Sequence, residues 1–292
     1  MERREFLRLT GAAGLVAAWG GSLACAQSTA AASPGAPGAA RVANGFTLAQ
    51  VGLQLYTVRD LMKADFEGTL AAVAKLGYKE VEFAGYFGRT PGQVKEALKA
   101  AGLSAPSAHV PLPPGNSEWS GTIQTAAEIG LKYLVVPSVP KEQRTTLADW
   151  QQLAKRFNEL GEATRKHGIR FAYHNHEYEF VMTGERLPYV VLLEETDRSL
   201  VEFEMDLFWI RKGGQDPVAY FKRFKGRFPL VHVKDMTLDG QMVDVGAGII
   251  DWKAIYAARK EAGIKYWFVE HDQPADPMQS LAASYRYMSA LD

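Results

Sequence analysis

The chain has 292 residues, and its 33 Lys and Arg are balanced by 33 Asp and Glu, so its formal net charge at pH 7 is zero. A neutral chain lacks the basic surface that binds nucleic acid or anionic lipid, so the composition argues against both partners. The only cysteine, Cys25, lies near the N-terminus. This position excludes a disulfide framework and a thiolate metal site from the rest of the chain.

Residues 1–26 predict an export signal. Arg3 and Arg4 precede a short Gly/Ala-rich apolar stretch, which is too short for a stable membrane span and ends at Ala24-Cys25-Ala26. The arginine pair indicates a twin-arginine signal, cleavage after Ala26, and a periplasmic or otherwise exported protein. A lipoprotein anchored at Cys25 is the alternative, although Ser22 matches a lipoprotein motif poorly.

Residues 27–47 are rich in Ala, Ser, Pro and Gly and predict a flexible tether, because such a stretch cannot bury a core. Residues 48–292 have the length of a single (β/α)8 barrel, which is about 250 residues.

The sequence after the tether alternates short apolar runs with longer amphipathic stretches. The apolar runs predict eight strands, within 51–58, 78–85, 104–110, 133–139, 170–176, 201–209, 228–235 and 266–272. Helical patterns lie between them, among them 66–77, 90–103, 150–168, 216–227 and 251–263. Alternating strands and helices predict a parallel sheet, and eight such units predict a closed α/β TIM barrel. An open doubly wound sheet is disfavoured, because no Gly-rich phosphate loop follows the first run.

Polar side chains gather where the apolar runs end, and five of the six histidines lie there. The fifth of these histidines is His271. The side chains expected to form a site are, in chain order, Gln54, Tyr56, Glu82, His109, His174, His176, Asp206, His232, Lys234 and Glu270. Active sites of (β/α)8 barrels lie at the carboxyl ends of the strands, so this set predicts one site.

Four of these residues predict a metal centre. His174, Asp206, His232 and Glu270 come from predicted strands five to eight. Because neighbouring strands lie about 4.8 Å apart, four inward side chains at one level can reach a common point. Two imidazoles and two carboxylates suit Mn²⁺, Co²⁺, Fe²⁺ or Zn²⁺. The alternative is a set of hydrogen-bonded polar residues at the mouth of the barrel.

In the segments 171–180, 203–209, 230–236 and 268–272, the chain resembles the xylose isomerase-like TIM barrel superfamily of sugar phosphate isomerases and epimerases. The resemblance covers residues 48–292 and implies that Asp206, His232 and Glu270 bind a metal. His174 stands where many epimerases have a glutamate, and His176 is the alternative ligand. The branch resembled includes inosose dehydratase-like and 3-keto-glycoside-processing proteins.

The resemblance implies proton abstraction next to a carbonyl, followed by epimerisation, isomerisation or elimination. The substrate expected is a keto-sugar, 3-keto-glycoside or inositol derivative, and phosphorylated sugars are disfavoured because no phosphate-binding loop is evident. Glu270, Lys234 and His176 are the candidate bases, although Lys234 is equally expected to hold a substrate hydroxyl or to pair with Asp235. The residues expected to bind substrate are His109, Glu82, Tyr56, Gln54 and Trp209, with Lys234 as an alternative partner of Glu82.

Two rival functions remain. The first is a non-catalytic exported sugar-binding protein with a vestigial metal site. The second is an endonuclease IV-like hydrolase, which would need a three-zinc cluster and a basic face that the sequence lacks. A small-molecule sugar or polyol is the expected partner, and a homo-oligomer is left open. The Pro/Gly-rich segment 110–119 is expected to cover the pocket.

Overall fold

The protein is described by a computed structural model for residues 51–291. The predicted export signal and tether lie outside these residues. No helix within 51–291 is long and apolar enough to cross a membrane.

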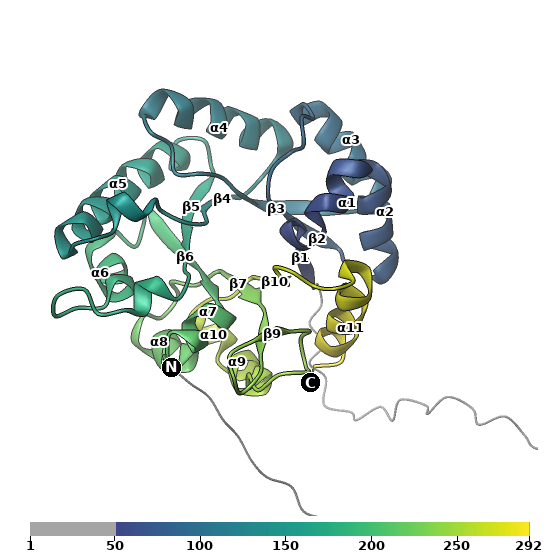
Figure 1. The fold of residues 1–292 in the computed structure, drawn as a ribbon. Coiled ribbons are helices and arrows are strands. Elements are labelled where there is room, and N and C mark those ends of the chain that lie inside the picture. Colours follow the sequence, from purple (N-terminus) through teal and green to yellow (C-terminus); the bar gives the residue numbers. More distant parts are fainter. Residues whose placement is uncertain (1–50, 292) are drawn as a thin grey trace, which may run out of the picture. The chain divides into compact units, whose positions relative to one another are not determined.

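Eight parallel strands close into a barrel, as predicted (Figure 1). They are β1 (Gly52–Gln54), β2 (Glu80–Phe83), β3 (Ser104–His109), β4 (Tyr133–Val136), β5 (Arg170–His174), β6 (Val201–Asp206), β7 (Leu230–Val233) and β10 (Tyr266–Val269). Each predicted run contains one of them. The barrel closes where β10 pairs with β1.

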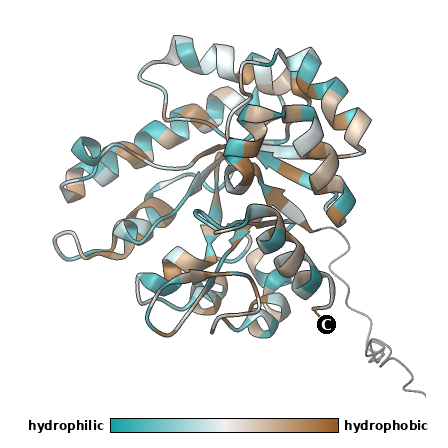
Figure 2. Cartoon of the chain, turned by 45° about the vertical axis from the view of Figure 1, so that its right-hand side comes forward, coloured by the Kyte–Doolittle hydropathy of each residue, from teal (hydrophilic) through white to brown (hydrophobic). Residues whose placement is uncertain are grey.

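Helices surround the barrel. They are α1 (Arg59–Ala64), α2 (Phe66–Leu76), α3 (Pro91–Ala101), α4 (Asn116–Ile129), α5 (Leu147–Arg165), α6 (Pro188–Glu195), α7 (Leu207–Lys212), α8 (Pro217–Arg223), α9 (Trp252–Ala257), α10 (Arg259–Ala262) and α11 (Pro277–Ser289). Short 3-10 turns are η1 (Leu55–Val58), η2 (Lys141–Gln143) and η3 (Tyr178–Phe180). The helical patterns 66–77, 90–103, 150–168 and 216–227 correspond to α2, α3, α5 and α8, and 251–263 contains α9 and α10. Figure 2 shows hydrophilic and hydrophobic residues interspersed along these helices, as in amphipathic helices.

Local chemistry sets the ends of these helices. Thr90 and Thr146 form capping boxes at the starts of α3 and α5. Gly77 ends α2 with a φ of 115°, and a Cβ at this position would lie 2.4 Å from the ring of Tyr285. Only glycine fits both the left-handed backbone and the close ring.

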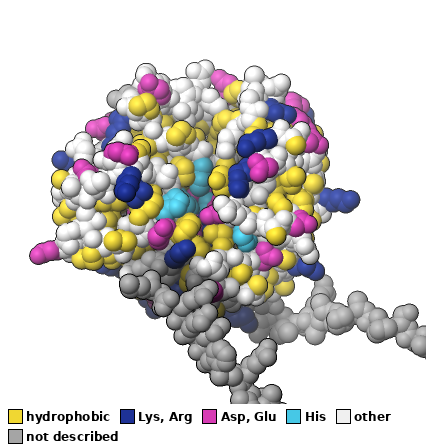
Figure 3. All heavy atoms as spheres, viewed as in Figure 1, with side chains coloured by type: hydrophobic (Ala, Val, Ile, Leu, Met, Phe, Trp, Pro, Cys, Tyr) yellow, Lys and Arg dark blue, Asp and Glu magenta, His cyan; other side chains and the backbone are white. Residues whose placement is uncertain are grey.

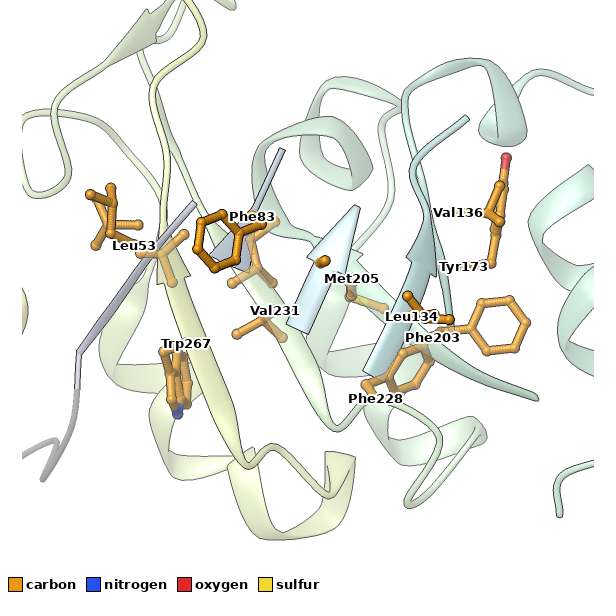
Figure 4. Close-up of a cluster of buried hydrophobic side chains, with 14 of the residues drawn as sticks. Leu53, Phe83, Leu134, Val136, Tyr173, Phe203, Met205, Phe228, Val231 and Trp267 are labelled. Atoms are coloured by element: carbon orange, nitrogen blue, oxygen red, sulfur yellow. The ribbon is translucent and has the colours of Figure 1, made fainter. Parts of the chain in front are cut away.

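Alternate residues along each strand face opposite sides of the barrel wall. Figure 4 shows outward side chains of the main core, including Leu53, Phe83, Leu134, Tyr173, Phe203 and Val231. Five residues form a separate interior cluster, namely Tyr133, Val135, Ala172, Leu230 and Phe268. The same alternation turns the polar residues near the strand ends inward.

Some of the polar residues at the ends of the predicted runs lie outside the strands. Asp206 ends β6, and its Oδ1 accepts hydrogen bonds from the backbone N–H groups of Phe208 and Trp209 at 2.9 Å, so α7 begins directly. After β7 the chain forms a hairpin of β8 (Asp235–Met236) and β9 (Met242–Val243), which the sequence analysis did not predict. Its turn is closed by Gly240 N–H donating to the Thr237 carbonyl.

Candidate active site

The four predicted metal ligands converge at the carboxyl end of the barrel. His174, Asp206, His232 and Glu270 are buried, and each offers one atom within 4.8 Å of the others' atoms. His174 Nε2 lies 3.2 Å from Asp206 Oδ2, and His232 Nδ1 lies 2.6 Å from Glu270 Oε2. Register places two of the four side by side, because Asp206 and His232 are paired across β6 and β7.

Hydrogen bonds behind the two imidazoles orient them. His174 Nδ1 lies 3.2 Å from the Pro137 carbonyl oxygen, and His232 Nε2 lies 2.7 Å from Glu82 Oε2. Because a carbonyl and a carboxylate only accept, these nitrogens carry the protons. In the neutral ring the other nitrogen, His174 Nε2 or His232 Nδ1, has its lone pair free toward the carboxylates. Partners of this kind orient the histidines of metal sites.

The surroundings of His232 Nδ1 indicate whether the four-donor site fits a cation. Burial lowers the pKa of His232, but Glu204 and Glu270 raise that pKa well above the ordinary value, so without a cation the ring is protonated. Nevertheless, buried Nδ1 has no hydrogen-bond partner, since its 2.6 Å contact with Glu270 falls outside hydrogen-bonding geometry. A cation held by the four donor atoms would give this buried nitrogen a partner. The donor set therefore fits a divalent metal.

Glu82 and Gln54 lie behind His232. The sequence analysis placed both against the substrate, but the structure buries them completely and neither lines the cavity. Glu82 accepts from Gln54 Nε2 at 2.7 Å, from Ser107 Oγ and from His232, and none of its contacts is with Lys234. The register that sets Gln54 beside Glu82 inside the barrel explains the difference.

Glu204 is a buried member of the site that the sequence analysis assigned no role. Its Oε2 lies 2.6 Å from His109 Nε2 and 3.1 Å from His232 Nε2. Burial lowers the pKa of His109, but Glu82 and Glu204 raise it to about 9, so the ring is charged at neutral pH. The signal was available, because Glu204 is two residues before Asp206 and faces the same interior.

Lys234 lies among three carboxylates. Its Nζ is 3.0 Å from Asp206 Oδ2, 2.8 Å from Glu270 Oε2 and 2.8 Å from Asp272 Oδ1. Burial lowers the pKa of Lys234, but these groups raise it well above the usual value. The alternative pairing with Asp235 is wrong, because Asp235 accepts instead from backbone N–H groups such as that of Gly246. Asp272 was not assigned a role from the sequence.

A cavity of about 620 Å³ lies next to the four donors, and of these His174 and Glu270 line it, whereas Asp206 and His232 lie behind its wall. Its polar lining is made by Tyr56, His109, Ser138, His174, His176, Lys234, Glu270 and Asp272. Figure 3 shows histidine side chains (cyan) in the hollow near the centre of this face. Val110, Pro111 and Leu112 of the predicted covering loop line the cavity, whereas Trp119 is buried in α4.

The comparisons with known proteins bear on this site. Residues 70–291 match the family described as xylose isomerase-like TIM barrel. The chain belongs to that family. Inosose dehydratase of Clostridium beijerinckii is 24% identical over 265 residues, which cover 76% of this chain and 88% of the relative.

Solved structures agree with this membership of the xylose isomerase-like TIM barrel family. A sugar phosphate isomerase/epimerase from Parabacteroides distasonis superposes with a TM-score of 0.74 and 27% identity, covering 86% of this chain and 96% of that one. The IOLI protein, whose structure contains a bound zinc atom, superposes with a TM-score of 0.67 and 16% identity, covering 83% and 99%. At that identity the likeness shows the fold.

In this xylose isomerase-like barrel, the last residue of β5, His174, and the histidine two residues later, His176, lie in different places. His174 belongs to the four-donor set, whereas His176 lines the cavity outside that set. Burial and the neighbouring His174 lower the pKa of His176 to about 3, and its buried Nδ1 has no hydrogen-bond partner. The ring is therefore neutral, and its free nitrogen is available to a ligand.

Two residues that the sequence analysis left without a role hold this segment. Glu179 Oε2 accepts from the His176 backbone N–H at 2.8 Å, and Asn175 Oδ1 accepts from the Asp206 backbone N–H at 3.1 Å. Trp209, expected to bind substrate, does not line the cavity, and its ring packs 5.6 Å from that of His176.

Proposed function

We propose that this chain is a divalent-metal-dependent isomerase, epimerase or lyase, which abstracts a proton next to the carbonyl of a keto-sugar, 3-keto-glycoside or inositol derivative. One observation carries the proposal: two imidazole nitrogens and two carboxylate oxygens converge beside an open cavity, which two of these residues, His174 and Glu270, line. Relatives named inosose dehydratase and sugar phosphate isomerase/epimerase support this substrate class.

His174, Asp206, His232 and Glu270 would hold the cation. Mixed nitrogen and oxygen ligation suits Mn²⁺, Co²⁺, Fe²⁺ or Zn²⁺. When bound, such a cation supplies Lewis acidity toward a substrate carbonyl oxygen, which makes the adjacent C–H group more acidic.

Glu270 is our candidate for the base. Burial raises the pKa of Glu270, but Lys234 and His232 hold that pKa well below the ordinary value, so the carboxylate is unprotonated at neutral pH. Lys234 is held as an ammonium and is better suited to donate to a substrate oxygen than to remove a proton. Neutral His176 is the second group on the cavity wall able to accept a proton.

The charge of the cavity favours an unphosphorylated substrate. Among the described residues that line it, Lys234 is the only lysine or arginine, and three carboxylates already contact its Nζ. Glu270 and Asp272 also line the cavity, and the charged ring of His109 is already paired with Glu204, so no cationic side chain of the described lining is free to bind a phosphate group.

Export by the twin-arginine route is a separate proposal, based on Arg3 and Arg4 before the apolar stretch. Replacing both arginines by lysine is expected to retain the protein in the cytoplasm, which cell fractionation would measure. Unchanged export of that variant would contradict the proposal.

Proton NMR in D2O tests the proposed chemistry. The full chain is loaded with Mn²⁺ or Co²⁺, incubated with a panel of keto-sugars and inososes, and treated with chelator before spectra are recorded. Deuterium is expected at the carbon next to a carbonyl with the wild type and with the control His167→Gln, which changes an exposed histidine outside the site. Glu270→Gln is expected to lose the exchange.

The same experiment separates the enzyme from a non-catalytic sugar-binding protein. Calorimetric binding of panel sugars to the metal-loaded wild type, without deuterium incorporation into any of them, would overturn the proposed reaction in favour of that alternative.

A further inference from the structure

One side of the cavity is built by the loops that follow β3 and β4. These loops contribute Val110, Pro111, Leu112, Pro137, Val139 and Pro140 to the lining. The only polar side chain that they add is Ser138. We call the six residues the apolar wall. In the strand order, β3 and β4 lie across the barrel from β7 and β10, which lead to Lys234, Glu270 and Asp272.

Several backbone groups of the apolar wall are already paired. The pairs are Val110 N–H with the Val135 carbonyl, Pro137 O with His174 Nδ1, Val139 O with Arg144 Nε and Pro140 O with the Gln143 N–H. The three prolines have no N–H group to donate. Hydroxyl groups pressed against this wall would lose hydrogen bonds to water with little replacement, which opposes binding of a ligand polar on all sides.

The remainder of the lining has the opposite chemistry. His109, Lys234 and Glu270 present charged groups there, and His176 presents a ring nitrogen without a partner. Figure 3 shows hydrophobic side chains (yellow) beside the central histidines. The volume of about 620 Å³ lies within the range of pockets that enclose drug-sized ligands, about 300–1,000 Å³. The cavity thus has space and surface for a ligand with two unlike halves.

We propose that the substrate is amphipathic: an uncharged hydroxylated ring faces the donor residues, and an apolar alkyl or aryl substituent covers the apolar wall. An aryl glycoside has this chemistry. The assignment of the hydroxylated half rests on the proposed function, whereas that of the apolar half rests on the wall itself.

Binding of matched glycosides tests the apolar half. Calorimetry on the metal-loaded full chain compares methyl and phenyl glycosides of several hexoses, none of which carries the ketone needed for proton abstraction. For at least one sugar, the phenyl compound is expected to bind about tenfold tighter or more, because its ring is removed from water. Leu112→Gln is expected to reduce this preference to less than about threefold without weakening the methyl glycoside.

Two further variants make the result decisive. Leu147→Gln changes another half-buried leucine, which does not line the cavity, and is expected to keep the phenyl preference. Leu112→Ala provides a second variant of the wall if thermal unfolding shows that Leu112→Gln is not folded.

Equal affinity for methyl and phenyl glycosides, no binding of any phenyl glycoside, or a preference that survives both Leu112 variants would overturn this inference. Deuterium exchange on small keto-sugars would then still stand, so the proposed function would survive. Phenyl preference without deuterium exchange on any keto-sugar would instead reject the reaction and keep the apolar half.

Discussion

At the scale of single residues, the proposed metal centre depends on side chains that orient its four donor residues. Glu82 is anionic and completely buried, and it accepts a hydrogen bond from His232 Nε2 on the side away from the proposed metal. Burial raises the pKa of Glu82, but His109 and His232 hold it well below the ordinary value. Such a carboxylate fixes the ring and makes its free nitrogen more basic.

Glu82→Gln is therefore expected to weaken Zn²⁺ or Mn²⁺ binding by roughly 10- to 100-fold. Competition with a chelator of known affinity measures this loss. Glu80→Gln is the matched control, because Glu80 is buried two residues earlier on β2 and does not belong to the four-donor set or contact it through Glu82. Equal metal affinity of the Glu82 variant and the wild type would show that this carboxylate does not support the centre.

Glu179 predicts a pH dependence of stability. Burial raises its pKa from 4.5 to about 8, although hydrogen bonds from Tyr173 and from His176 N–H oppose the rise. Between these values the folded chain holds a proton that the unfolded chain releases. This residue's contribution to the free energy of unfolding therefore falls as pH rises from about 4.5 to 8, by at most about 1.4 kcal/mol per pH unit.

Glu179→Gln removes this titration. The free energy of unfolding of the variant minus that of the wild type is expected to increase from pH 5 to pH 8 and then to level off. Urea unfolding at several pH values measures the difference. A difference that stays constant over this range would contradict a protonated Glu179 in the folded state.

The residue types in the sequence predicted the four proposed metal donors. They did not predict the side chains, deeper in the barrel, that hydrogen-bond to these donors. The four donors could be recognised as candidate metal ligands because they lie near the ends of apolar runs. They are His174, Asp206, His232 and Glu270. Gln54 and Glu82 lie near the ends of runs in the same way, and strand-end position alone does not distinguish a residue facing the cavity from one deeper in the barrel. That distinction depends on strand register, which brings Glu82 beside Ser107 and which one sequence does not specify.

At the scale of elements, Asp235 organises the segment that follows β7. Its buried carboxylate accepts from the N–H groups of Met236, Gly246, Gly248 and Ile250 and from Trp252 Nε1. A Cβ on Gly248 would lie 2.2 Å from Asp235 Oδ1, so the backbone can approach this closely only as glycine. One side chain thus connects the β8–β9 hairpin to the start of α9.

Asp235→Ala is expected to lower the free energy of unfolding by on the order of 3 kcal/mol or more, because several buried donors lose their acceptor. Urea unfolding measures the change. Asp239→Ala, in the exposed turn of the same hairpin, is expected to change stability by less than about 0.5 kcal/mol. Similar losses for both variants would contradict the organising role of Asp235.

Elements with strong local signals were predicted, and those made by tertiary contacts were not. The amphipathic patterns predicted α2, α3, α5 and α8, since their apolar faces and caps lie within the segment itself. The β8–β9 hairpin is short, and its first strand begins at Asp235, the last residue of the predicted run 228–235. Its anchoring at Asp235 comes from donors at residues 246–252, beyond the reach of a local pattern.

At the scale of the whole molecule, barrel closure makes the proposed metal centre possible. Three of the four donors lie in β5, β6 and β7, and Glu270 directly follows β10. These four strands are successive neighbours around half of the ring. A bound cation would join these strands, so binding is expected to stabilise the folded barrel by mass action. The eight-unit alternation predicted this closure, although it did not specify which side chains occupy each level of the interior.

A crystal of the Zn²⁺- or Mn²⁺-loaded protein, measured at the absorption edge of its metal, tests the central claim most directly. We expect one anomalous peak within about 2.0–2.3 Å of His174 Nε2, Asp206 Oδ2, His232 Nδ1 and Glu270 Oε2. A fully loaded crystal without a peak among these four atoms, or with its metal bound elsewhere, would contradict the proposed centre and the enzyme built on it.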